Sequence, residues 1–196
     1  MAARGRHKHR VETQVSDKQN FSEEERQQWA AEQRQGRNLW DELLQMRDEQ
    51  RADVEKSIWL IKGKDLPVEN NKQGLMQWYM HPLLKGNCIN TLQIYVQTIP
   101  PGGRSGRLHH PGDQVIFIWE GQGYTTIDGQ KHHWSKHDLV QLPLRVDGVV
   151  VQHFNTDPDN EAKLICCEPN QVHSAYVDRG SGFEQLEVSP DYKPKG

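Results

Sequence analysis

Three histidines stand where a folded chain could use them as ligands. His109 and His110 lie just before an apolar run at residues 115–119, and His153 lies in a later apolar segment. Neutral imidazole is the commonest nitrogen ligand for iron, zinc and nickel in proteins. Histidines carried by separate strands into one interior would form an open metal site, whereas a lone buried histidine is more often held by hydrogen bonds alone. The three residues are therefore candidate metal ligands.

The segments that must position these histidines have the pattern of short strands. Residues 91–99 alternate polar and apolar side chains and are rich in β-branched residues, and Pro100 to Gly103 ends the segment. Asp128-Gly129 is a strong signal for a hairpin turn. Further strands are predicted at residues 58–61, 115–119, 124–127, 139–143, 149–154, 162–167 and 172–177. Because strands do not alternate with helices, the pattern predicts an all-β sandwich or barrel and not a dinucleotide-binding fold.

The residues before the barrel predict a helical extension. Ser22 and Glu25 have the spacing of a capping box, and residues 21–56 are rich in good helix formers, with Gly36 as a break between two helices. The extension is mostly polar, and its large apolar residues include Trp29, Trp40, Leu43 and Leu44. Exposed apolar groups of this size usually find a partner surface, so we predict a homodimer.

The domain boundaries follow from changes in composition along the chain. Residues 1–20 are basic and poor in apolar groups, which predicts a flexible tail. Residues 57–180 are assigned to the β-barrel and residues 181–196 to a C-terminal tail. A chain of 196 residues of which 34% are hydrophobic fits one domain with a polar extension.

Charge, hydropathy and cysteine content exclude several classes of function. The formal net charge of -3 argues against nucleic acid as the main partner, and no apolar stretch approaches the ~20 residues of a membrane-spanning helix. Cys88, Cys166 and Cys167 give neither a disulfide framework nor zinc spacing. We therefore expect reduced thiols in a cytoplasmic protein that acts on a small molecule, with no nucleic-acid or membrane partner.

The spacing of residues before the apolar run resembles the first motif of the cupin superfamily. That motif has a glycine, five residues, His-x-His, three or four residues, a glutamate, six residues and a glycine. Gly102 and Gly121 fit its two ends. Leu108 and His110 then fall at the two histidine positions, and Gln114 falls at the acidic position. The resemblance implies a jelly-roll β-barrel in which only one of these ligand positions keeps its usual residue.

The second cupin motif is similar to residues farther along the chain. Pro143, Gly148 and Asn155 fit its proline, glycine and asparagine, and Val151 falls at its histidine position. His153 lies two residues later, so it shares the side of the strand on which Val151 lies. His153 is thus a substitute candidate for the missing ligand.

Two segments resemble the gentisate-dioxygenase-like branch of the superfamily, namely residues 120–129 and 152–158. Members of that branch bind Fe(II) through histidines and cleave aromatic rings with dioxygen. The resemblance implies Fe(II), with another divalent metal or none as alternatives. Alternation points His109 outward unless the Pro111-Gly112 turn twists the strand. The candidate ligands are His110, His153, His109 and Gln114.

Candidate substrate contacts complete the sequence-based interpretation. Arg104 and Arg107 precede the first motif and could grip a carboxylate, and Tyr95 and Trp119 could line an aromatic pocket. The first functional hypothesis is an Fe(II) dioxygenase that acts on a small aromatic or related acid. The alternatives are a non-catalytic cupin that binds a small molecule, and a metal-dependent isomerase, lyase or decarboxylase on the same barrel.

Overall fold

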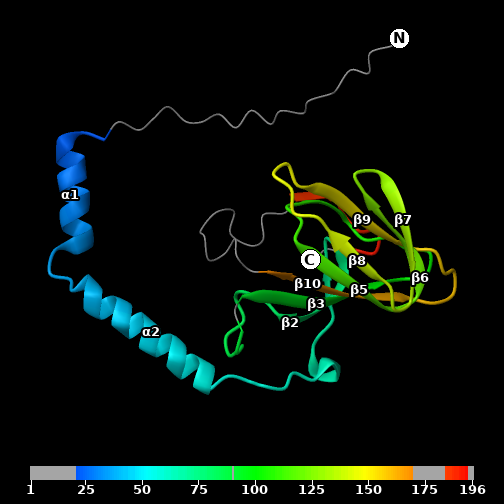
Figure 1. The fold of residues 1–196 in the computed structure, drawn as a ribbon, viewed down its shortest axis with the longest axis horizontal. Helices are drawn as coiled ribbons and strands as arrows, with labels where there is room; N and C mark the ends of the chain where they lie inside the picture. Colours follow the sequence, from blue (N-terminus) through cyan, green and yellow to red (C-terminus); the bar gives the residue numbers. More distant parts are fainter. Residues whose placement is uncertain (1–20, 90, 170–183, 194–196) are drawn as a thin grey trace, which may run out of the picture. The chain divides into compact units, whose positions relative to one another are not determined.

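The computed structural model describes residues 21–89, 91–169 and 184–193 (Figure 1). The chain divides into two compact units between Gln50 and Arg51. The tail predicted for residues 1–20 and the strand predicted for residues 172–177 lie outside the described residues. Within the described part of the chain, no helix is long and apolar enough to cross a membrane.

The helical extension consists of α1 (Glu23–Arg34) and α2 (Leu39–Glu55). The predicted capping box is present, because the Glu25 amide donates to the Ser22 hydroxyl and the Ser22 amide donates to the Glu25 carboxylate. Gly36 separates the helices with a φ of 74°, in the left-handed region that glycine favours. The local sequence signals therefore predicted both helices.

Eleven strands within the described residues form two antiparallel sheets. The six-stranded sheet contains, in spatial order, β1 (Glu69–Asn71), β2 (Gly74–Met80), β3 (Leu92–Ile99), β10 (Ala162–Pro169), β5 (Gln114–Glu120) and β8 (Leu139–Leu142). The five-stranded sheet contains β11 (Glu184–Glu187), β4 (Arg107–His110), β9 (Val149–Asn155), β6 (Gln122–Ile127) and β7 (Gln130–Ser135). The predicted all-β barrel with an N-terminal helical extension is confirmed.

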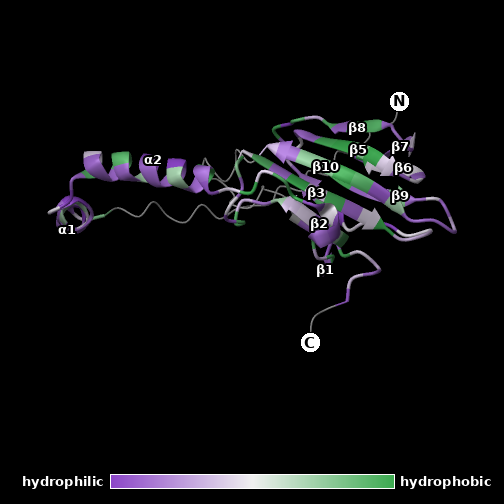
Figure 2. Cartoon of the chain, turned by 90° about the horizontal axis from the view of Figure 1, so that it is seen from below, coloured by the Kyte–Doolittle hydropathy of each residue, from purple (hydrophilic) through white to green (hydrophobic). Residues whose placement is uncertain are grey.

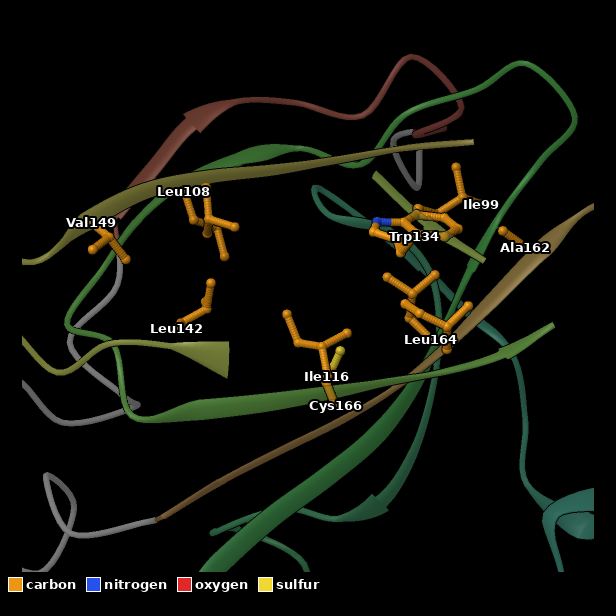
Figure 3. Close-up of a cluster of buried hydrophobic side chains, with 11 residues drawn as sticks. Ile99, Leu108, Ile116, Trp134, Leu142, Val149, Ala162, Leu164 and Cys166 are labelled. Atoms are coloured by element: carbon orange, nitrogen blue, oxygen red, sulfur yellow. The ribbon is translucent and has the colours of Figure 1, made fainter. Parts of the chain in front are cut away.

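The apolar core lies between the two sheets. Ile116, Ile118 and Leu164 point inward from β5 and β10 and are fully buried. Val149 of β9 and Trp134 of β7 belong to the same core cluster, which Figure 3 shows. Strands β5 and β10 are coloured hydrophobic over much of their length in Figure 2, as expected for strands in the middle of a packed sheet.

The predicted hairpin at Asp128-Gly129 joins β6 to β7. Both residues have positive φ angles, 50° and 82°, as a two-residue turn of the favoured hairpin type requires. The Asp128 carboxylate also accepts a hydrogen bond from the Val150 amide at 2.8 Å. This turn fixes the register of β6 against β9, which carries His153.

Two boundaries differ from the prediction. Residues 58–61 were predicted as a strand but make only one isolated bridge, Ile58 to Asn87. Their side chains are largely exposed, so the apolar run does not pack into the sheet as predicted. The first strand of the barrel begins at Glu69. The residues predicted as a C-terminal tail include β11, which pairs with β4 and extends the five-stranded sheet.

Candidate functional site

His110 lies inside the barrel with both ring nitrogens engaged. It is 2% exposed, and alternation along β4 turns it inward. The Gly112 amide donates to Nδ1 at 2.9 Å, so the ring proton lies on Nε2, which donates to the Glu168 carboxylate at 2.8 Å. Gly112 has a φ of 95°, and a Cβ there would lie 2.0 Å from the Pro143 carbonyl oxygen. Glycine at this turn therefore allows the contact that orients His110.

A hydrogen-bonded chain continues from Glu168 across the six-stranded sheet. The Gln114 side-chain amide donates to the Glu168 carboxylate and to the Tyr95 hydroxyl, both at 3.0 Å. Burial raises the pKa of the Tyr95 hydroxyl well above its usual value, and burial also raises the pKa of the neighbouring Cys166 thiol. Both groups are therefore neutral near pH 7, and Glu168 is the acidic member of the cluster.

His153 belongs to a second buried polar group. Its Nδ1 lies 2.8 Å from the Thr125 hydroxyl, which also accepts a hydrogen bond from the Trp134 indole at 3.0 Å. Burial, and secondarily the charge of His110, lower the pKa of His153 from 6.5 to about 4. His153 is therefore neutral near pH 7.

His109 does not join the interior cluster. Its Nε2 lies 2.7 Å from the Asp147 carbonyl oxygen, on the opposite side of β4 from His110. The local twist that would turn it inward is absent, because β4 pairs with β9 in unbroken register from Leu108 to His110. The structure thus separates His109 from the other three candidate ligands, His110, His153 and Gln114.

Two apolar residues occupy the remaining ligand positions of the cupin motifs. Leu108 and Val151 face each other across β4 and β9 and are 8% and 3% exposed. No group of three histidine, cysteine, aspartate or glutamate side chains in the described part of the chain could hold a metal ion. A facial Fe(II) site needs about three protein ligands and open positions. These residues, with both nitrogens of His110 already bonded, do not fit that site.

A cavity of about 270 Å³ lies between the β1 edge of one sheet and the β11 edge of the other. The Trp78 and Tyr95 rings, 4.8 Å apart, form an aromatic wall, and His110 lies at its inner end. The Gln73 side-chain amide donates to the Gln185 side chain at 2.9 Å and so bridges the two edges. The lining consists of Glu69, Asn71, Lys72, Gln73, Met76, Trp78, Tyr95, Leu108, His110 and Gln185.

Of the four predicted substrate contacts, Tyr95 lines this cavity and the other three do not. Arg107 pairs with Glu187 of β11 at 2.8 Å. Arg104 forms an isolated bridge with Phe154. Trp119 is 44% exposed, because alternation along β5 turns it away from the core.

Sequence reasoning missed Glu168 and Trp78. Glu168 follows Ala162, Leu164 and Cys166 at two-residue intervals, all of which are buried. This alternation was a signal that the carboxylate points inward. Trp78 lies on β2, a strand that the sequence reading did not predict.

Comparison with known proteins identifies the barrel. Residues 95–168 match the model of a protein family described as a cupin domain. The barrel has the cupin fold. The jelly-roll fold that the motif spacing implied is thereby confirmed, while the resemblance to the gentisate-dioxygenase-like branch stays a prediction.

The cupin domain is also similar to individual proteins. It resembles the HTH-type transcriptional regulator PuuR of Escherichia coli (strain K12), with 31% identity over 75 residues, or 38% of this chain and 39% of that protein. The regulator of the same name from Shigella flexneri gives the same values. The chain therefore spans 39% of the length of the curated relatives that it matches.

Two solved structures are similar to this chain. A cupin-like protein from Thermotoga maritima is 24% identical, covers 61% of this chain and 87% of its own, and has a TM-score of 0.46. The polyketide cyclase RemF from Streptomyces resistomycificus is 11% identical, covers 68% of this chain and 89% of its own, and has a TM-score of 0.51. At its identity, the likeness to the polyketide cyclase concerns the fold alone.

Proposed function

We propose that the cupin domain binds a small aromatic carboxylic acid in the cavity between β1 and β11 and acts as a binding module. The observation that carries this proposal is which side chains lie at the inner end of the cavity and how they are hydrogen-bonded. There the aromatic wall meets His110, whose two nitrogens are both bonded within the protein. The inner end therefore offers ring faces and apolar side chains, and few free polar atoms.

The lining suits a ligand with one apolar end and one polar end. Met76, Trp78 and Leu108 provide apolar contact in the cavity. Lys72 and Gln73 lie in the turn between β1 and β2, and the Lys72 side chain is exposed. An aromatic ring would be buried against the wall, and its carboxylate would face Lys72. A volume of about 270 Å³ limits the ligand to about one ring with small substituents.

A binding role agrees better with the interior than a redox role. The Fe(II) dioxygenase, and likewise the metal-dependent isomerase, lyase or decarboxylase, would need ligands where Leu108 and Val151 lie. The relatives named PuuR are transcriptional regulators by name and are not named as enzymes. Both observations support the non-catalytic alternative for this cupin domain.

The proposal is tested by calorimetric titration of the full chain, purified without a histidine tag. Benzoate and 2,5-dihydroxybenzoate should bind, and Trp78→Leu should raise the dissociation constant by about tenfold because part of the aromatic wall is lost. Trp119→Leu, which removes an exposed tryptophan outside the cavity, is the matched control. Lys72→Met should weaken binding of benzoate but not of neutral benzamide.

Two results would overturn the proposal. One is that neither acid binds at millimolar concentration, or that both bind the Trp78 and Trp119 variants equally well. The other is elemental analysis that finds one equivalent of iron in the purified protein, together with consumption of dioxygen when 2,5-dihydroxybenzoate is added. That second result would restore the dioxygenase hypothesis.

A further inference from the structure

Helix α2 carries an apolar stripe that none of its described neighbours covers. Leu39, Leu43 and Met46 follow one another at intervals of four and three residues, and they are 44%, 60% and 65% exposed. Trp40, beside the stripe, is also exposed. No side chain of α2, which lies wholly in the described part, is buried. Figure 2 shows hydrophobic stretches alternating with hydrophilic ones along this helix.

Such a helix needs a partner. An isolated helix of 17 residues is marginal in water even when its sequence favours helix. Most helical stability in proteins comes from packing an apolar stripe against another surface. Helix α2 therefore requires a surface that covers its apolar stripe.

We propose that α2 pairs with α2 of a second copy of this chain, as a short parallel two-stranded coiled coil. Intervals of four and three residues place Leu39, Leu43 and Met46 at heptad positions d, a and d. In a parallel dimer each of these side chains packs against its own counterpart, so the stripe is complementary to itself. This proposal does not depend on the function proposed for the cavity.

Charge complementarity favours a second copy in parallel orientation. Glu42 falls at position g and Arg47 at the following position e, and these positions face each other across a parallel dimer. An antiparallel dimer would place Glu42 near Glu49 of the other copy, and like charges would repel. The parallel arrangement gives two Glu42–Arg47 contacts between the copies.

The pairs that these residues make within one chain do not prevent the exchange. Glu42 pairs with Arg37, and Arg47 pairs with the adjacent Asp48. All four side chains are about 40% exposed or more, and exposed ion pairs contribute little to stability. Trading them for pairs between copies therefore costs little.

The same pattern limits the length of the contact. The next stripe positions after Met46 are Gln50 and Asp53, which are polar. Packing between the copies therefore extends from Leu39 to Met46, with Trp40 at its flank. Because this contact covers little more than two turns, we expect a weak dimer that dissociates on dilution.

The test is sedimentation equilibrium of the full chain between about 1 and 100 µM. The parent should shift from monomer to dimer in this range. Leu43→Lys should raise the dissociation constant at least about tenfold, because a charge replaces an apolar residue at position a in both copies. Gln45→Lys changes the exposed polar face of the same helix by the same charge and is the control. Circular dichroism of each variant checks that the helix is retained.

A charge exchange tests the orientation. Glu42→Arg and Arg47→Glu alone should each weaken the dimer by roughly two- to tenfold, and the double variant should restore it, because both contacts reform with reversed signs. A parent that stays monomeric at 100 µM, a Leu43→Lys variant that dimerises as well as the parent, or a double variant that is not rescued would each overturn the proposal. Dimerisation that survives Leu43→Lys would place the interface elsewhere on the chain.

Discussion

Acid should destabilise this barrel through His153. Burial and the charge of His110 lower its pKa from 6.5 to about 4. Below pH 6.5 the unfolded chain therefore takes up a proton that the folded chain does not accept until about pH 4. The free energy of unfolding must then fall as the pH falls through this window. One pKa unit corresponds to about 1.4 kcal/mol, so the loss is about 2 kcal/mol at pH 5 and about 3 kcal/mol below pH 4.

The assay is urea denaturation of the parent and of His153→Gln at pH 7, 6, 5 and 4.5. The variant should be less stable than the parent at pH 7, because the Thr125 and Trp134 hydrogen bonds are disturbed. Its unfolding free energy should then decline less steeply below pH 6.5, since a glutamine has no proton to gain. Titrating groups that lie far from His153 contribute equally to both proteins, so the difference between the two curves reports His153 together with its coupling to His110.

His109→Gln provides the control, because His109 lies on the outer side of β4 and bonds only a loop carbonyl among the described residues. It should keep the pH dependence of the parent. The reasoning is refuted if His153→Gln and the parent lose stability in parallel between pH 6.5 and 4.5. It is equally refuted if His109→Gln removes the dependence.

Three further changes probe the interior. Glu168→Ala should cost about 2–4 kcal/mol in urea denaturation, because it removes the carboxylate to which His110 Nε2 donates and one of the two acceptors of the Gln114 side-chain amide. Gly112→Ala should lower the midpoint of thermal unfolding, since its Cβ would meet the Pro143 carbonyl and its φ is positive. The double variant Leu108→His with Val151→His should gain binding of Fe(II) in an anaerobic titration, and a double variant that binds no more iron than the parent would contradict the assignment of these two positions to the interior.

Local patterns were sufficient to predict the fold and three of the polar residues buried inside the barrel. Two-residue alternation placed His110, Gln114 and His153 on the inner side of their strands, and all three are buried there. The capping box and the Asp128-Gly129 turn also formed as predicted. Each of these features depends on residues within a few positions of one another, which is why one sequence was enough.

Features that depend on distant pairing were not predicted. β1 is short and polar, and β11 has the sequence Glu-Gln-Leu-Glu, so neither has the composition of a strand. Both exist because a neighbouring strand offers hydrogen bonds, β2 for β1 and β4 for β11. The same pairing brings Glu187 to Arg107, and an arginine that looked free for a substrate carboxylate is thereby engaged in an ion pair.

The bonding of His110 connects the missing ligands to the proposed function. Once Leu108 and Val151 occupy two ligand positions, a buried histidine between the sheets must satisfy its nitrogens by hydrogen bonds, and Gly112 and Glu168 provide them. A metal at His110 would have to displace one of these two hydrogen-bond partners inside the barrel. Leu108 and Val151 have no ligand atom with which to offset the lost hydrogen bond. The proposed aromatic acid would meet no such cost, because it would contact the Trp78 and Tyr95 rings and leave the hydrogen bonds of His110 intact. Leu108, which stands at one of the motif's ligand positions, also lines the cavity in which we propose that an aromatic acid binds.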